Sequence, residues 1–293
     1  MKQNGKLEKA KLLFEKNIEI FRCPVCKDNM KINDKSSLIC NNNHCFDISK
    51  KGYVNLANRS SNKIYGKDLF ESRNKIYNAN FYDRLITELV DIVDEYTLYK
   101  NKNYILDTGC GEGHYLNQLS KNQNLSNKYD FVGIDISKEG INIATREGND
   151  IIWCVSDLSN LPFQTCKFAV ILNILSPANY EEFIRVLDNK GIVIKVIPES
   201  EYLKEIRYGI QNKMKSNNYS NKNVIEVFHQ HLEIVSEKRL NYKCSIDKSN
   251  LKDLIKMTPL TSSLSKEQKD DLIKLDISSI TIDLRILVGR CKK

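Results

Sequence analysis

The segment YILDTGCGEG, residues 104–113, decides the fold of this 293-residue chain. Its first four residues are mostly apolar and predict a short buried strand, and the glycine-rich turn leads into a helix expected over residues 114–120. A dinucleotide-binding turn needs Gly-x-Gly-x-x-Gly, so its third glycine would fall at position 114, which is His114. The glycines stand instead at 109, 111 and 113, and this spacing argues against a dinucleotide site.

Further strands and helices alternate along the chain on both sides of this segment. Apolar strands are expected at residues 131–135, 151–155, 168–172 and 192–197, and a helix at 138–147. Helical spacing predicts one or two helices over residues 70–96 and another over 203–214. Two closing antiparallel strands are expected at 232–235 and 280–288. Alternation at this spacing indicates parallel βαβ units, and therefore an α/β fold with a doubly wound sheet.

The glycine spacing suits a loop that binds S-adenosylmethionine (SAM), where no pyrophosphate has to be approached. Gly109 and Gly111 lack side chains, so the backbone can touch the methionine part of this cofactor. Asp107 or Glu112 can meet its ammonium group, and the helix after Gly113 offers a positive N-terminus to its carboxylate. A glycine-rich turn alone, however, occurs in many α/β proteins.

Two further acids follow later strands. Asp135 ends the second strand, where a carboxylate can accept both ribose hydroxyls, and Asp157 follows the third strand, where the adenine amino group would lie. An acid at a strand end is more often a helix cap, so each position alone is a weak signal. The three elements together predict a class I SAM-dependent methyltransferase with a Rossmann-like sheet.

Four cysteines and one histidine cluster between residues 23 and 45. Cys23 and Cys26 can place two thiolates on one turn, and Cys40 and His44 can complete a tetrahedral Cys3His zinc site. Cys45 is the alternative to His44, because adjacent residues rarely ligate one metal together. A redox Cys-x-x-Cys is the other alternative, but no βαβ pattern surrounds the pair. A structural zinc ion is expected, since so small a lobe needs metal-binding free energy to fold.

The positive charge of the chain is concentrated in its first quarter. Residues 1–66 carry 13 Lys and Arg against 6 Asp and Glu, whereas the remaining 227 carry 32 against 31. A basic end on a near-neutral body suggests a polyanionic partner at that end. The alternative is a general bias toward lysine, since the chain has 35 Lys and 10 Arg.

Composition narrows the class and the compartment. A hydrophobic fraction of 41% with 28% charged residues argues against a disordered or fibrous chain. The apolar runs are far shorter than the roughly 18 residues that span a bilayer, and the N-terminus lacks an apolar leader core, so neither a membrane segment nor secretion is expected. Nine cysteines, an odd number, favour a reducing compartment, and we expect a cytoplasmic location.

The chain contains several further short motifs besides the zinc-ligand pattern. The zinc-ligand pattern is followed by FDISKKGYVNL at residues 46–56, and later segments are DTGCGEG at 107–113, GIDISK at 133–138, LPF at 161–163, SP at 176–177, RVL at 185–187 and MTP at 257–259. Together they resemble the RlmA-type 23S rRNA (guanine-N1) methyltransferases over nearly the whole chain beyond Asn17. Residues 173–177 are more similar to the Gram-positive branch, some of whose members confer macrolide resistance.

The resemblance implies an enzyme that transfers a methyl group from SAM to N1 of a guanine in a hairpin loop of 23S rRNA. The zinc module would grip the RNA, with phosphate and stacking contacts expected from Lys50, Lys51, Tyr53 and Arg59. A solvated face is the alternative interpretation of these residues. A homodimer in which two zinc lobes form one cleft also remains open.

At the cofactor, the resemblance adds His114, Tyr115 and Leu158 to the expected SAM contacts. The family carries an aromatic residue after the glycine-rich loop, but its acid near residue 157 is not uniform. Asn173 and Ser176 are expected to orient the target base. The alternative is a simple turn whose proline opens the next helix.

The expected organisation is an N-terminal extension at residues 1–19, a zinc-binding RNA-recognition module at 20–59, a helical linker at 60–98 and a SAM-dependent methyltransferase domain at 99–293. Two other functions remain open, namely methyl transfer from SAM to a small molecule and zinc-dependent RNA binding without catalysis. The basic first quarter argues against the former, and the intact glycines with Asp135 argue against the latter.

Overall fold

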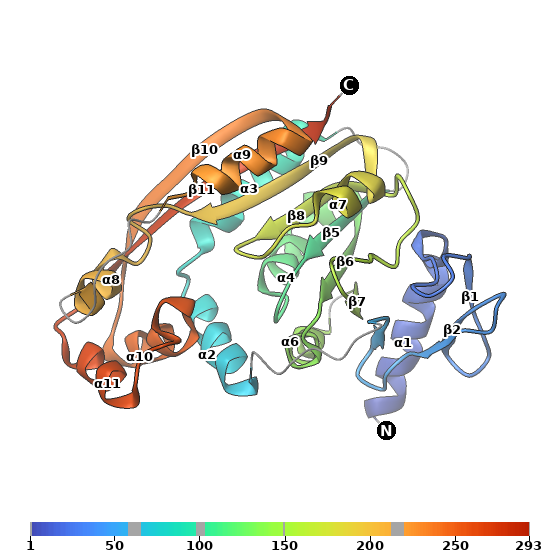
Figure 1. Ribbon diagram of the computed structural model, residues 1–293. Coiled ribbons are helices and arrows are strands. Elements are labelled where there is room, and N and C mark those ends of the chain that lie inside the picture. The colour runs from blue at the N-terminus through green and yellow to red at the C-terminus, as the bar shows by residue number, and fades with distance from the viewer. Residues whose placement is uncertain (1, 58–65, 98–102, 149, 212–219, 293) are drawn as a thin grey trace.

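Two β-sheets and the helices around them make up the structure, a computed structural model that describes residues 2–57, 66–97, 103–148, 150–211 and 220–292. The larger sheet has eight strands in the order β10-β11-β9-β8-β5-β6-β7-β4, and the smaller has three in the order β1-β2-β3 (Figure 1). Within the described residues, no helix is long and apolar enough to cross a membrane.

Five parallel strands form the centre of the large sheet and confirm the predicted α/β fold. β5 pairs with both β6 and β8, so the strand order reverses between β5 and β8. In open α/β sheets, ligands bind at such a reversal, beyond the carboxyl ends of the strands. The five strands are β5 (Asn103–Thr108), β6 (Tyr129–Asp135), β7 (Ile151–Val155), β8 (Phe168–Ile174) and β9 (Leu187–Pro198).

A long antiparallel hairpin closes one edge of this sheet. β11 (Ser279–Cys291) lies between β9 and β10 (Leu232–Ser245) and is antiparallel to both. The hairpin confirms the two predicted closing strands, although β10 continues well beyond residue 235. Because β10 is an edge strand, most of its later side chains are polar and exposed, so no apolar run marks it in the sequence.

The opposite edge of the sheet is formed by a strand from the N-terminal part of the chain. β4 (Tyr53–Asn55) pairs in parallel with β7 and places Tyr53 beside Trp153. The N–H of Leu56 then donates to the carbonyl of Val155 at 2.8 Å. A segment that follows the metal-ligand residues is therefore also a strand of the main sheet.

Helices cover both faces of the large sheet and create two hydrophobic cores. One core contains side chains of α3 (Asp83–Tyr96), α4 (His114–Lys121) and α6 (Lys138–Ala144), and the other contains those of α1 (Lys2–Lys16), α7 (Tyr180–Val186) and α9 (Lys222–His231). Neighbouring strand residues such as Ile105 and Leu106 point to opposite cores. Burial on both faces explains why the central strands are continuous apolar runs.

Another group of helices lies beyond the carboxyl ends of the parallel strands (Figure 1). It consists of α2 (Lys67–Asn78), α8 (Lys204–Gln211), α10 (Lys248–Met257), η3 (Pro259–Thr261) and α11 (Lys266–Lys274), and α2 packs against α10. The helical spacing over residues 70–96 thus corresponds to two helices, α2 and α3. Other short helices are η1 (Ile18–Ile20), α5 (Gln123–Ser126) and η2 (Thr145–Glu147).

The small sheet docks on the main body through residues 161–163. The N–H of Arg22 donates to the carbonyl of Pro162 at 3.0 Å, and the rings of Phe21 and Phe163 lie with their centroids 5.5 Å apart. The LPF segment is therefore a docking strip for the N-terminal module. The three strands of the small sheet are β1 (Met30–Ile32), β2 (Ser37–Cys40) and β3 (Cys45–Asp47).

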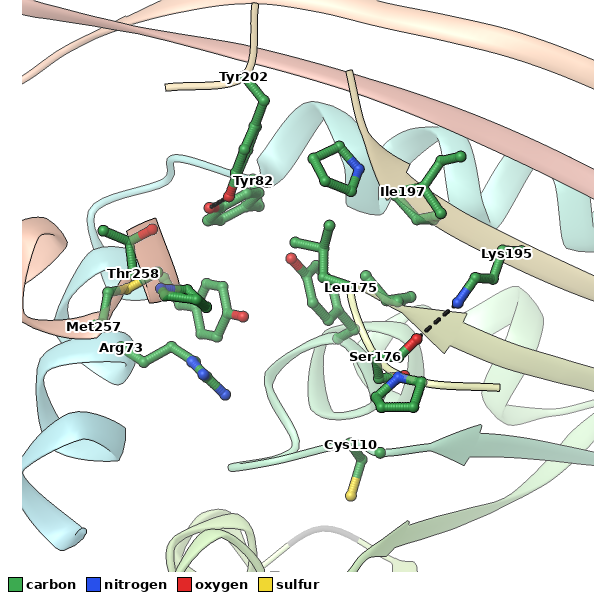
Figure 2. A pocket seen from close by; sticks show the side chains of 18 of the residues that line it. Arg73, Tyr82, Cys110, Leu175, Ser176, Lys195, Ile197, Tyr202, Met257 and Thr258 are labelled. Atoms are coloured by element: carbon green, nitrogen blue, oxygen red, sulfur yellow. Dashed lines mark hydrogen bonds between the residues drawn. The ribbon is translucent and has the colours of Figure 1, made fainter. Parts of the chain in front are cut away.

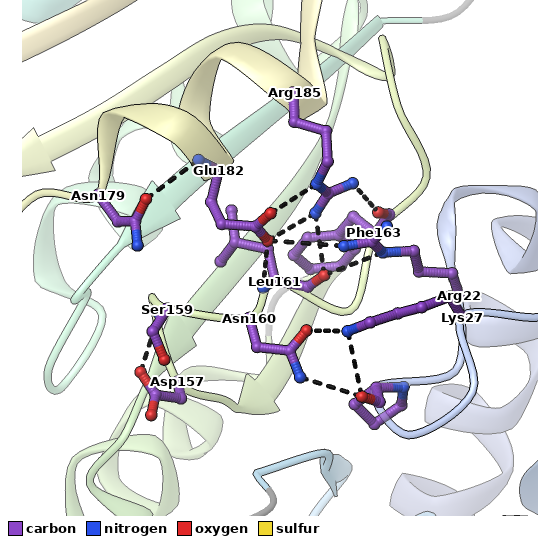
Figure 3. A network of polar contacts seen from close by, with 11 residues as sticks. Arg22, Lys27, Asp157, Ser159, Asn160, Leu161, Phe163, Asn179, Glu182 and Arg185 are labelled. Atoms are coloured by element: carbon purple, nitrogen blue, oxygen red, sulfur yellow. Dashed lines mark hydrogen bonds and ion pairs between the residues drawn. The ribbon is translucent and has the colours of Figure 1, made fainter.

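Glu182 is the centre of a polar network that joins the two parts (Figure 3). Its carboxylate accepts hydrogen bonds from the guanidinium of Arg185 at 2.6 and 2.7 Å and from the N–H of Leu161 at 2.6 Å, and Arg22 lies 3.7 Å away. Burial alone would raise the pKa of Glu182, but these hydrogen bonds and the two arginines hold it below its ordinary value of 4.5. The ionised carboxylate therefore stabilises the docked arrangement.

Replacing Glu182 by Gln is expected to lower the free energy of unfolding at neutral pH by about 2 kcal/mol, because two arginines lose their anion. For a chain of this size, the corresponding fall in Tm is about 5 °C. A lowered folded pKa gives stability that is present above the unfolded pKa and lost as pH falls through the folded pKa. The difference from wild type should therefore shrink below about pH 4.

Thermal denaturation followed by circular dichroism measures both effects. Glu181→Gln, which changes the exposed neighbour on α7, is the matched control and should leave Tm unchanged. An equal loss in this control, or a Glu182→Gln deficit that stays constant down to about pH 3, would contradict the role of the ionised carboxylate.

Candidate active site and metal centre

The four predicted metal ligands come together at the small sheet: Cys23, Cys26, Cys40 and His44. Their ligand atoms all lie within 4.8 Å of one another. The Sγ atoms of Cys26 and Cys40 are 3.6 Å apart, and Nδ1 of His44 is 3.4 Å from Sγ of Cys40. Tetrahedral zinc with Zn–S bonds of about 2.3 Å requires about 3.8 Å between sulfurs and about 3.6 Å between sulfur and nitrogen. The spacing fits one zinc ion.

Two tight turns present these ligands. Lys27 has φ 67° and donates its N–H to the carbonyl of Cys23 at 2.9 Å, and Asn43, with φ 61°, precedes His44. Cys45 begins β3, is exposed, and lies outside the cluster that the described residues form. The structure therefore selects His44 over Cys45. A Cys3His cluster is typical of a closed structural zinc site and not of a redox pair.

The glycine-rich loop between β5 and α4 is shaped by close neighbours. Gly109 has φ +74°, and a Cβ on it would lie 2.8 Å from Cβ of Ser176, in the loop after β8. Gly113 has φ +75°, and a Cβ there would lie 2.4 Å from the ring of Trp153. Glycine suits both the left-handed backbone and these close approaches. The glycine-rich loop thus lies directly against the loop that follows β8.

A cavity of about 420 Å³ opens at the carboxyl ends of β5, β8 and β9 (Figure 2). The glycine-rich loop lines it on one side, and residues 174–177 and 195–198 form a wall at the ends of β8 and β9. The facing wall comes from α2 and from residues 257–260, which include the MTP motif. This is the place where the reversed strand order predicts a ligand site.

Two acids and one arginine lie together in the cavity. Arg73 reaches over the loop from α2 to 3.5 Å from Glu112, and its guanidinium would lie 3.2 Å from a Cβ on Gly111. Oδ2 of Asp107 and Oε1 of Glu112 are buried and lack a hydrogen-bond partner among the described residues. The methionine part of SAM carries an ammonium, which would satisfy the acids, and a carboxylate, which would meet the arginine. The residues present therefore fit this cofactor.

Burial perturbs both acids. It raises the pKa of Asp107 to about 8, and the charges of Asp135 and Glu112 add to the effect. Burial also raises the pKa of Glu112 to about 7, although Arg73 opposes the shift. A cation bound between the two carboxylates would reverse these shifts. Buried acids with perturbed pKa values in a cavity are typical of a functional site.

Six predicted cofactor contacts do not line this cavity: Gly111, Gly113 and His114, which belong to the glycine-rich loop and the start of α4, and Asp135, Asp157 and Leu158, which follow the next strands. Asp135 accepts hydrogen bonds from the N–H groups of Gly111 at 2.8 Å and Ser137 at 2.7 Å, and so fixes the glycine-rich loop to the end of β6. Asp157 accepts a hydrogen bond from the backbone two residues further on at 2.9 Å. Leu158 packs against the core shared with α1. Their contacts with the adenosine part stay predictions.

The two aromatic residues that begin α4 take different positions. Tyr115 lines the cavity, as expected of a cofactor contact. His114 stacks instead on Tyr77 of α2, with ring centroids 4.3 Å apart, and burial lowers its pKa to about 4. His114 packs against α2 and does not line the cavity, and its contact with the cofactor stays a prediction.

The two residues expected to orient the target base also differ. Ser176 lines the cavity, whereas Asn173 is fully buried behind it. The amide of Asn173 donates to the carbonyl of Pro177 and to Oγ of Ser176, both at 2.7 Å, and that Oγ donates to the carbonyl of Thr108 at 2.8 Å. Asn173 therefore holds the loop, and its expected contact with a base is corrected.

Several cavity residues carry no motif and were not predicted. Arg73 comes from α2 and Lys195 from β9, and Tyr82 and Tyr202 bring their hydroxyls to 2.7 Å from each other at the far end (Figure 2). For Lys195 a signal existed, because a lysine inside the apolar run GIVIKVI is unusual in a strand buried on both faces.

The residues expected to contact RNA are only partly available to it. Lys50 and Lys51 are exposed in the turn before β4. Lys51 also lies close to Lys6 of α1. The pKa of Lys6 is lowered mainly by its burial and further by the charge of Lys51. Tyr53 is buried in the first core, so it offers no exposed ring for stacking, and its expected role is corrected. Arg59 lies outside the described residues.

Known proteins resemble both parts of the chain. Residues 21–57 match the zinc-ribbon model described as "RlmA, N-terminal", and residues 105–191 match the model of a methyltransferase domain. The "Putative 23S rRNA (guanine-N(1)-)-methyltransferase YxjB" of Bacillus subtilis is 36% identical over 275 residues, which cover 93% of this chain and 98% of that protein. The chain belongs to the 23S rRNA (guanine-N1) methyltransferase family.

Other similarities are more distant. The "23S rRNA (guanine(748)-N(1))-methyltransferase" of Streptomyces fradiae is 26% identical over 246 residues, which cover 83% of this chain and 85% of that protein. The solved structure of the YcgJ protein of Bacillus subtilis is 15% identical, with a TM-score of 0.45, and covers 70% of this chain and 98% of that one. The chain is therefore a SAM-dependent methyltransferase with a zinc-binding N-terminal module. This confirms the predicted enzyme class and cofactors.

Zinc content tests the ligand set. Cys26→Ser and His44→Ala are expected to lose most of their zinc, because a closed site that keeps only three ligands binds the ion far more weakly. Cys45→Ser is the matched control and should retain about one zinc ion per chain. Elemental analysis after desalting against a chelator measures the ratio. Zinc kept by His44→Ala and lost from Cys45→Ser would reverse the assignment.

SAM binding is expected to release protons near neutral pH. Asp107 and Glu112, with pKa values of about 8 and about 7, are partly protonated at pH 7, and a bound ammonium favours their ionised forms. Affinity should therefore fall as pH drops below about 7. It should reach its maximum near pH 8, where the ligand's own ammonium begins to lose its proton.

Calorimetric titration in buffers of different ionisation enthalpy counts the released protons. Asp107→Asn should weaken SAM binding and release fewer protons than wild type. Binding enthalpies that are the same in every buffer would contradict the placement of the ammonium beside these acids.

Proposed function

We propose that the protein transfers a methyl group from SAM to N1 of a guanine in a hairpin loop of 23S rRNA. The observation that carries the proposal is a cavity in which Asp107, Glu112 and Arg73 share the space with a polar part of the wall at the ends of β8 and β9. We call this part, formed by Ser176 and Lys195, the rim. One part suits an amino acid zwitterion, and the rim suits the polar edge of a base. The names of the Bacillus and Streptomyces relatives supply the reaction class.

The cofactor half of the cavity already presents charged groups that suit the amino acid part of SAM. When bound, SAM supplies a methyl group on a sulfonium, an electrophile that needs alignment more than activation. Asp107 and Glu112 would hold the ammonium, and Arg73 the carboxylate. Asp135, fixed at the end of β6, would accept the ribose hydroxyls with its remaining lone pairs.

The rim after β8 would meet the target base, which has to leave its stack to enter the cavity. Leu175 lines the cavity with φ 51°, an unfavourable backbone conformation for a residue other than glycine. The hydrogen bonds of Asn173 and Ser176 hold the loop in this shape. An apolar side chain beside hydrogen-bonding groups suits a flat heterocycle with polar edges.

The N-terminal module would bring the RNA to this cavity. Residues 1–66 hold 13 Lys and Arg against 6 Asp and Glu, Lys50 and Lys51 are exposed, and Lys51 lies close to Lys6 of α1. Clustered lysines bind phosphates without reading sequence. A structured hairpin is recognised by its shape, its phosphates and the bases that project from its loop. The basic end is therefore a reason to prefer RNA over a small molecule as substrate.

Primer extension on protein-free 23S rRNA tests the proposal. After incubation with the protein and SAM, reverse transcriptase is expected to stop one nucleotide before the modified guanine, because N1-methylguanine cannot form a Watson–Crick pair. The first guanine to inspect is 748, the position named for the Streptomyces relative.

Reactions without SAM and with the Asp107→Asn variant are the controls, and both should give full-length product. Full-length product from the wild-type reaction, despite measurable SAM binding, would contradict the proposal. In a parallel reaction with SAM labelled in its methyl group, label transferred to RNA without an arrest would contradict N1 as the acceptor atom.

A further inference from the structure

Lys195 places a buried ammonium group on the wall of the cavity. It lies on β9 directly across from Asn173 of β8, and its side chain is 4% exposed. Nζ donates to the side-chain oxygen of Asn173. It also donates to the carbonyl of Ser176 at 2.7 Å (Figure 2). An ammonium has three N–H groups, so one donor remains for a ligand in the cavity.

This cation has neutral oxygens as its partners. Within the described residues, no carboxylate forms an ion pair with Lys195, and burial, uncompensated by any acid, lowers its pKa to about 8. The charged groups that share the cavity walls with it are Arg73, Asp107, Glu112 and Arg207. A buried cation without a counter-ion is costly unless an anion arrives in the cavity, and such a group stabilises negative charge that develops beside it.

Two anions could fill this role in a SAM-dependent methylation of guanine. The carboxylate of SAM is the first, but Arg73 already lies with the two acids that would hold the rest of the amino acid group. The second is the base itself. Guanine N1 carries a proton at neutral pH, and the negative charge left by its removal is shared with O6, the neighbouring oxygen. Ser176, a partner of Lys195, belongs to the rim that would meet the base.

We propose that Lys195 donates a hydrogen bond to O6 of the target guanine and stabilises the negative charge that forms there when N1 loses its proton. This inference rests on the proposed function. The N1 proton passes to water, and the N1 electron pair forms the new N–C bond. The bond from the methyl carbon to sulfur breaks with its electrons remaining on sulfur, and O6 returns to a neutral carbonyl oxygen. Lys195 keeps its own proton throughout.

The test compares Lys195→Met, Lys195→Arg and wild type by single-turnover rate, SAM affinity and pH profile. Lys195→Met keeps an unbranched chain without the charge and should lower the single-turnover rate about 100-fold or more, with SAM affinity within about threefold of wild type. Its deficit should shrink between neutral pH and about pH 9.5, because solvent then removes the N1 proton without help and because Lys195 of the wild type, with a pKa of about 8, loses its own charge. Lys195→Arg should recover much of the rate, since it restores the charge and the donors. Lys190→Met, which alters an exposed lysine on the same strand, is the control.

Other results would overturn the inference in distinguishable ways. A deficit of equal size at every pH, with unchanged SAM affinity, would mean that Lys195 only supports the loop. A parallel loss of SAM affinity would assign it to the cofactor. If Lys195→Met does not fold, judged by circular dichroism, Lys195→Arg decides, since an inactive but folded Arg variant contradicts a role for the charge. Failure of wild type to form N1-methylguanine would instead refute the proposed function itself.

Discussion

The parallel pairing of β5 with β8 is the constraint on which both the fold and the site depend. It sets Asp107 beside Leu172, so the loops that leave the two strands start side by side. These loops then approach so closely that a Cβ on Gly109 would overlap Ser176. The acids proposed to hold the cofactor and the loop proposed to meet the base are thus held in register by the main chain.

Sequence patterns were sufficient where local rules govern the structure. Apolar runs predicted the five central strands because both faces of each strand are buried, and cysteine spacing predicted the metal cluster because two turns present all four ligands. The glycine spacing predicted the loop, although the packing of Gly113 on Trp153 is a contact between segments that no local pattern contains.

The rest of the site depends on contacts between distant segments. Arg73 reaches the cavity because α2 packs on α10, and Lys195 reaches it because β9 adjoins β8. The spacing of apolar residues along the sequence predicts neither contact. Tyr53 and Asn173 were misjudged for the same reason. Tyr53 was expected to contact RNA and Asn173 to orient the target base, but pairing with β7 and β9 buries both side chains.

β4 joins the metal-bearing module to the same sheet that carries the glycine-rich loop. Its pairing with β7, together with the network around Glu182, attaches the module at two separate places. An RNA stem bound by the module would therefore lie at a fixed distance from the cavity. The distance between the bound stem and the cavity would then help to determine which nucleotide enters, before any base edge is recognised. A stem longer or shorter by one base pair would present a different nucleotide to the same chemistry.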